Sequence, residues 1–214
     1  MLVIGLWLSG CSSVSTFYIK VNGYTDPSAP AQVKPGGSFC VIENHEAQNP
    51  LLEKEIKEKL NKLLLTHGYP VTTFEKADYY LFFGYGMGEP RSVTVATPDY
   101  FGSIGWGGGY GWGGGWGGPS VYVGMPWGGY ASGSASLYDR WLLIKVVEGP
   151  AYRTQKVSRP VWVGEARSVG ASSDLRLVLN YLLVADFKEF GKNTGQAVTV
   201  QIGEGSPEVY SLTH

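Results

Sequence analysis

Charge, histidine and cysteine are all scarce in this sequence of 214 residues. Charged side chains make up 16% of it, below the usual quarter, and the formal net charge is −1. Such a chain has no overall field that would attract nucleic acid or another polyanion. The two cysteines are Cys11 and Cys40. If Cys11 is processed, Cys40 is left alone, and we then expect no disulfide and a Cys40 that behaves as a small buried hydrophobe.

Motifs for catalysis, metal binding and phosphate binding are also missing. His45, His67 and His214 each lack a second histidine or cysteine at the spacing of metal ligands. The segment Gly84-Tyr85-Gly86-Met87-Gly88 lacks the third glycine of a dinucleotide fingerprint, and no helix is expected after it. No nucleophile elbow and no pair of acidic residues stands out. The sequence therefore predicts a protein that is not an enzyme and has no catalytic residues, metal or cofactor.

The apolar run at the start, Met1 to Leu8, is far too short to cross a bilayer as a helix, which takes about 20 residues. It is typical of the hydrophobic region of a secretory signal peptide, here residues 1–10. Signal peptides normally begin with positive charge, and no lysine or arginine precedes this run. A truncated or misassigned start would explain that departure.

The four residues Leu8-Ser9-Gly10-Cys11 resemble the bacterial lipobox, Leu-(Ala/Ser)-(Gly/Ala)-Cys. The resemblance implies that a diacylglyceryl group is attached to the sulfur of Cys11, that the preceding peptide is removed and that the new amino terminus is acylated. Stable anchoring takes two or more acyl chains, which this processing supplies. Ser12, in place of aspartate, implies the outer membrane, with the protein on its inner leaflet facing the periplasm. Residues 11–16 are then a lipidated tether.

Periodicity predicts a single α+β domain over residues 17–203, followed by a mobile tail at 204–214. Strands are expected at residues 17–21, 38–44, 77–86, 136–148, 160–169 and 197–202. The order strand, strand, helix, strand occurs twice, which is compatible with a duplicated unit. We expect an antiparallel or mixed sheet with two helices on one face and a hairpin loop through Arg159.

Two helices are expected, and the first is defined by its ends. Asn49 suits its cap and Gly68 its exit. Its apolar stripe faces the core, while glutamates placed four residues before lysines predict a solvated face: Glu53–Lys57, Glu55–Lys59 and Glu58–Lys62. The second helix should begin after a cap at Ser172 or Ser173, run to about Phe190 and be the more buried of the two.

Residues 100–134 form a long segment rich in glycine, tryptophan and tyrosine, with no charged side chain between Asp99 and Asp139. No period of 2 or 3.6 organises its rings, so we expect a flexible loop between the halves of the domain. Three interpretations stay open: a tolerated insertion, a loop that contacts a protein or lipid partner, and a platform for stacking sugars. Nucleic acid is disfavoured because no lysine or arginine lies among the rings. The candidate contact residues are Trp106, Tyr110, Trp112, Trp116 and Trp127.

Several stretches together resemble a family of bacterial envelope lipoproteins known only as a domain of unknown function. The matching stretches are LSGC, KADYYLFFGYG, GWGGGYGWGGGWGG, LYDRWLLIKVVE and PVWVGEARS. In the family a tryptophan followed by a glycine and an acidic or polar pair recurs in the last of these strands, here Trp162-Val163-Gly164-Glu165. The common Asp-Pro-(Glu) entry to the second helix is SSDL here. The resemblance implies a fold and a compartment, and it carries no activity.

The sequence thus predicts a lipid-anchored envelope protein that faces the periplasm and acts as a non-catalytic structural, assembly or interaction component. Its expected partners are the membrane, through the lipid on Cys11, and an envelope protein. The alternative is a module that binds peptidoglycan or polysaccharide through the aromatic loop. A hydrolase whose site forms only in three dimensions is a third, weaker alternative.

Overall fold

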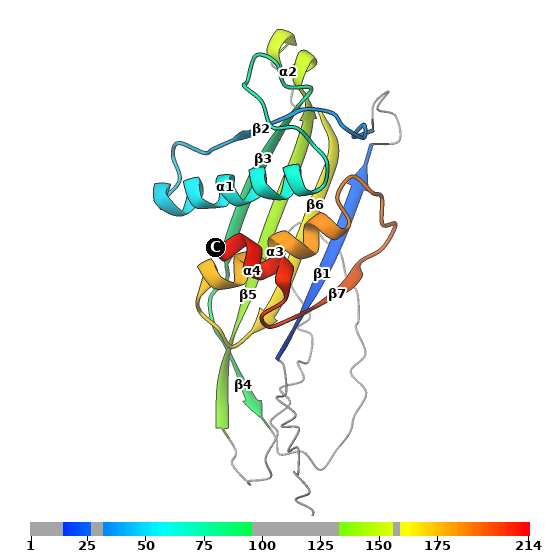
Figure 1. The fold of residues 1–214 in the computed structure, drawn as a ribbon. Helices are drawn as coiled ribbons and strands as arrows, with labels where there is room; N and C mark the ends of the chain where they lie inside the picture. The colour runs from blue at the N-terminus through cyan, green and yellow to red at the C-terminus, as the bar shows by residue number, and fades with distance from the viewer. Residues whose placement is uncertain (1–14, 27–31, 96–132, 156–158) are drawn as a thin grey trace, which may run out of the picture.

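A computed structural model of the chain describes residues 15–26, 32–95, 133–155 and 159–214. Within these residues, seven strands form a mixed sheet accompanied by four helices, which confirms the α+β fold class (Figure 1). The strands are β1 (Thr16–Thr25), β2 (Phe39–Ile42), β3 (Tyr79–Met87), β4 (Arg91–Val95), β5 (Gly133–Glu148), β6 (Pro160–Gly170) and β7 (Val198–Gly203). The helices are α1 (Pro50–Thr66), α2 (Gly149–Gln155), α3 (Leu175–Lys188) and α4 (Pro207–Thr213).

The sheet joins the two halves of the chain. Its order is β2-β3-β5-β6-β1-β7, and β4 pairs with β5 beside this path. β2 and β3 are parallel, and the other neighbours are antiparallel. β1 lies between β6 and β7, so the first strand is held by two strands from the second half. The pairing differs between the halves, because β2 pairs with β3 whereas β1 separates β6 from β7, and the duplication stays a prediction.

Side-chain caps define where the two long helices begin. The Oδ1 atom of Asn49 accepts a hydrogen bond from the backbone N–H of Leu52 (3.1 Å), which confirms the predicted cap of α1. Gly68 follows that helix with a φ of 81°. The predicted cap of α3 was one residue or two too early, since Asp174 caps it and accepts from the N–H of Leu177 (3.0 Å).

Two predicted loops are helices. The predicted hairpin loop after β5 instead contains α2, held in place by Arg153, whose Nη1 donates to the carbonyl oxygens of Phe74 (3.1 Å) and Ala77 (2.8 Å). The prediction of a mobile tail at 204–214 is wrong, because α4 forms there. Its side chains Val209 and Leu212 are buried, and α4 packs against α3, so tertiary contacts order this short segment.

α1, α3 and α4 lie on the same side of the sheet (Figure 1). Two helices, α1 and α3, were predicted on this face, and α4 is an additional one. α3 is buried from Val178 to Phe187, more continuously than α1, as the sequence predicts. No helix in the described part of the chain is both long and apolar enough to cross a membrane. The largest fully buried side chains of the core between the helices and the sheet include Phe39, Trp162, Phe187, Ile19, Ile56 and Leu60.

One charged residue of α3 lies inside this core. Asp186 is fully buried, and neither of its carboxyl oxygens has a hydrogen-bond partner. The carboxyl group faces Gly164 of β6, where a Cβ atom would come within 2.6 Å of both oxygens. Burial, reinforced by the nearby Glu165, raises the pKa of Asp186 well above its usual value. The glycine therefore makes room for a carboxyl group that is most stable in its protonated form.

This environment predicts that Asp186→Asn stabilises the protein increasingly as pH rises. A folded-state pKa above the unfolded one means that the stability is intact below the unfolded pKa of about 3.8 and is lost as pH rises towards the folded pKa, by up to about 1.4 kcal/mol per pH unit. Asparagine does not ionise, so the two proteins should have similar free energies of unfolding near pH 4 and diverge towards pH 8. Urea unfolding across this range measures the difference, and parallel pH profiles would contradict it.

Candidate functional site

The site residues predicted from the sequence lie outside the part of the chain that the structure describes. These are the lipidation candidate Cys11 and the contact candidates Trp106, Tyr110, Trp112, Trp116 and Trp127. The strands on either side of the aromatic segment are described, and their ladder pairs Val95 of β4 with Gly133 of β5. The predicted end of the loop, residue 134, is therefore wrong by two residues, because β5 already begins at Gly133.

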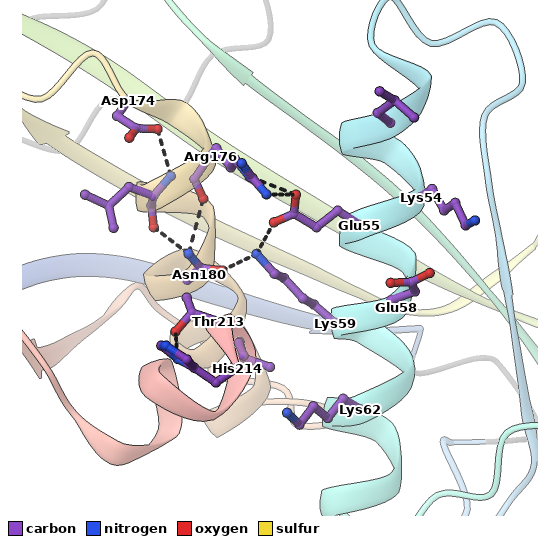
Figure 2. Close-up of a pocket in the computed structure, with 13 residues that line it drawn as sticks. Lys54, Glu55, Glu58, Lys59, Lys62, Asp174, Arg176, Asn180, Thr213 and His214 are labelled. Atoms are coloured by element: carbon purple, nitrogen blue, oxygen red, sulfur yellow. Dashed lines mark hydrogen bonds and ion pairs between the residues drawn. The ribbon is translucent and has the colours of Figure 1, made fainter.

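The helix side of the protein contains a groove of about 780 Å³ between α1, α3 and α4 (Figure 2). Most of its lining is polar or charged. Figure 2 shows Glu55 and Lys59 of α1 pointing towards Arg176 and Asn180 of α3. The leucines Leu51 and Leu177 also line it, and both have exposed side chains.

Four of the lining residues form a network that we call the α1–α3 clamp: Glu55, Lys59, Arg176 and Asn180. The Nζ atom of Lys59 donates to Glu55 (2.5 Å) and to Asn180 (2.6 Å), and Nε of Arg176 donates to Glu55 (2.8 Å). Partial burial alone would raise the pKa of Glu55, but the hydrogen bonds from Arg176 and Lys59 outweigh it and the pKa lies below its usual value. The carboxylate is therefore ionised and paired.

The clamp corrects one prediction for α1. The predicted pair Glu55–Lys59 is present, but the lysine is only 7% exposed, and Glu53 is buried as well. That side of α1 was predicted to be solvated. Lys59 is buried because α3 packs beside it, and Asn180 accepts from Lys59 across 121 residues of sequence. Glu53 instead accepts from the backbone N–H of Asn44 (2.9 Å).

The described residues include no group of three or more histidine, cysteine, aspartate or glutamate side chains that could hold a metal ion. Cys40 is a free, partly buried thiol, and burial raises its pKa, which disfavours the reactive thiolate at neutral pH. His214 lines the groove and stacks on Tyr210 at a centroid distance of 4.2 Å. Its Nδ1 also lies 3.0 Å from the hydroxyl oxygen of Thr213, which lines the groove as well. The clamp carboxylate of Glu55 is bound by two cations.

The opposite face of the sheet is different. Of the described helices, only α2 packs on it, at one end, where Tyr152 meets Tyr80 and Phe82. We call the remainder of this side, over β3, β5, β6 and β1, the open face. Its side chains alternate in sequence with core residues, and it carries exposed apolar groups beside charged ones: Tyr18, Lys20, Tyr24, Trp141, Leu143, Lys145, Glu165 and Arg167.

Trp141 of β5 is the largest side chain at the centre of the open face, and it is 37% exposed. The prediction of candidate residues missed it, although the signal was present. Leu142, Ile144 and Val146 alternate towards the core, which places Trp141 and Leu143 on the other side of the strand. The sequence does not reveal which side of the sheet the helices leave uncovered.

Solved structures with a similar outline have low sequence identity to this chain. A PDZ domain protein from Parabacteroides distasonis is 14% identical with a TM-score of 0.45, over 88% of this chain and 39% of that one. This chain thus spans about two fifths of that protein's length. A PelC dodecamer from Paraburkholderia phytofirmans is 11% identical with a TM-score of 0.41, over 82% of this chain and 98% of that one.

No curated protein matches the sequence. A family model does match, and it covers residues 21–190. This range includes the second half of β1, all of β2 to β6, and the helices α1, α2 and α3. That family is described as a domain of unknown function, in agreement with the resemblance found in the sequence. The protein is therefore a member of the DUF4136 family.

Proposed function

We propose that this protein is anchored by lipid on Cys11 to the bacterial outer membrane, faces the periplasm and acts by binding, without catalysis. The observation that carries the proposal is the sequence Leu8-Ser9-Gly10-Cys11, placed immediately before the folded domain. β1 begins at Thr16, five residues after the cysteine. Five extended residues span at most about 18 Å, so the lipid would hold the sheet close to the bilayer surface.

The energetics of the anchor suit a permanent attachment. Each methylene buried in the bilayer contributes about 0.8 kcal/mol, and two or three acyl chains together hold a domain stably where one chain does not. Ser12 follows the cysteine, and by resemblance to bacterial sorting rules this favours transfer to the outer membrane.

The paired side chains of the clamp support a structural role for that part of the helix side. In the groove, the carboxylate of Glu55 is paired with Lys59 and Arg176, and the ammonium group of Lys59 also donates to Asn180. Groups that satisfy one another in this way fix the packing of two helices and are not free to act on a substrate. The thiol of Cys40 is disfavoured as a nucleophile by its raised pKa.

Metabolic labelling with palmitate tests the anchor. The wild-type protein should incorporate label and sediment with membranes, whereas Cys11→Ser should do neither because it lacks the sulfur that is acylated. Cys40→Ser is the matched control and should behave as wild type, since that thiol belongs to a strand of the folded domain. Label in the Cys11→Ser protein would contradict the proposal.

A structural clamp predicts a large loss of stability when its buried cation is removed. Lys59→Met leaves Asn180 and Glu55 without that donor and should lower the free energy of unfolding by about 2–4 kcal/mol. Lys57→Met is the matched control on the same helix. Its ion pair with Glu43 (2.5 Å) is more exposed, 35% for the lysine side chain against 8% for Lys59, and should contribute less than about 1 kcal/mol. Equal losses in urea unfolding would argue against the clamp.

A further inference from the structure

Four large apolar or aromatic side chains stay exposed on the open face. Tyr18 and Tyr24 belong to β1, and Trp141 and Leu143 belong to β5. Only β6 lies between these two strands, so the two pairs are about 10 Å apart across the sheet. Val163 of β6, the cross-strand partner of Tyr24, is partly exposed between them. These side chains share one surface, unlike apolar residues that are scattered singly and need no partner.

The indole of Trp141 makes the centre of this surface level. Its cross-strand partner on β3 is Gly86, and Gly84 lies two residues away on the same side of that strand. A Cβ atom at Gly86 would come within 2.6–2.8 Å of the indole atoms Cζ2, Cε2 and Nε1, and one at Gly84 would lie 3.7 Å from Cζ3. The ring therefore lies against the backbone of β3 and fills the space of two side chains. A level surface of this kind suits contact with a planar partner.

Charged side chains of both signs occur on the same face: Lys20, Lys145, Arg167, Asp139 and Glu165. Nε of Arg167 donates to Glu165 (2.7 Å), and Asp139 is ion-paired with Arg91 of β4. The ammonium group of Lys145 lies over an aromatic ring, 5.4 Å from its centre. Because both signs are present and paired within the protein, charge does not select the occupant of this face. The apolar and aromatic side chains must do so.

The start of β1 brings this face close to the proposed lipid anchor. Tyr18 follows Cys11 by seven residues, which span at most about 25 Å when extended. α3 and α4 lie on the other side of the sheet, and α3 packs on β1 there (Figure 1). If that side faced the bilayer, a layer of helices about 10 Å thick would separate β1 from the lipid. With the open face towards the bilayer, no described helix lies between them.

A bilayer interface accepts the side chains that this face presents. Tryptophan and tyrosine are enriched at the level of the headgroups, because each has an apolar body and a polar edge. Charged side chains at that level remain in contact with water and headgroups. We infer that the open face lies on the bilayer surface, with Tyr18, Trp141 and Leu143 in contact with lipid. The inference rests on the proposed anchor at Cys11 and assigns an orientation to the anchored domain.

Photo-crosslinking from lipid tests this orientation without cellular processing. In the full chain with Cys40→Ser, Cys11 is the single cysteine, and it is coupled to a maleimide-bearing lipid in phosphatidylcholine vesicles that contain a diazirine phosphatidylcholine. Failure of palmitate labelling in cells thus leaves this result unaffected. Mass spectrometry should find about fivefold more label on Tyr18, Trp141 and Leu143 than on the helix side. Leu51 and Tyr210 are the matched controls there, since they are 81% and 61% exposed, against 61% for Tyr18.

Two carboxylates on the open face should disturb the contact. The double variant Tyr18→Glu, Leu143→Glu should lose most of the label on β1 and β5, because a carboxylate is costly to bury among acyl chains. Tyr210→Glu should keep the wild-type pattern, and the urea transition of each variant reports folding. Equal label on both sides, label mainly on the helix side, or unchanged label in a folded double variant would overturn the inference. An unlabelled open face in a protein that sediments as a dimer would also overturn it and assign that face to a second copy.

Discussion

The packing of α3 against the centre of the sheet is the interaction on which the rest of the structure depends. α3 lies over β1, β5 and β6, and its residues from Val178 to Phe187 are buried there. β1 comes from the beginning of the domain and the other two strands from its second half, so this layer forms only when distant segments have met. The loop-closure entropy opposes that meeting, and burial of apolar surface drives it. Once α3 is in place, α1 and α4 pack beside it, and of the described helices only α2 packs on the other side of the sheet.

Local signals predicted much of this fold, and tertiary contacts determined the remainder. The cap at Asn49, the exit at Gly68 and the alternation in β5 follow from neighbouring residues, and each is present as expected. α2 and α4 are short helices that depend on contacts made by Arg153, Val209 and Leu212, so composition alone predicted loops. Lys59 meets Asn180 across 121 residues, and no local pattern reveals such a pair. No local pattern reveals either that Gly164 leaves space for the carboxyl group of Asp186.

The two sides of the sheet suggest a division of roles. The charged groove on the helix side is joined by its own hydrogen bonds and fixes the packing of α1 on α3. The open face instead presents the indole of Trp141, which lies against the glycines of β3. β1 contributes to both the core and the open face, through Ile19 and Lys20, and it begins where the proposed tether ends. An anchor at that end would hold the sheet close to the membrane surface.

Membership of the family establishes the relationship of this chain and leaves its activity to experiment, and the compartment is the claim that decides which partners are available. Mass spectrometry of the amino-terminal fragment of the protein, purified from its native host, tests that claim most directly. The account predicts a mature chain that begins at Cys11, with diacylglycerol on its sulfur and an acyl group on its amino nitrogen. A fragment that retains residues 1–10, or that begins with an unmodified Cys11, would contradict it.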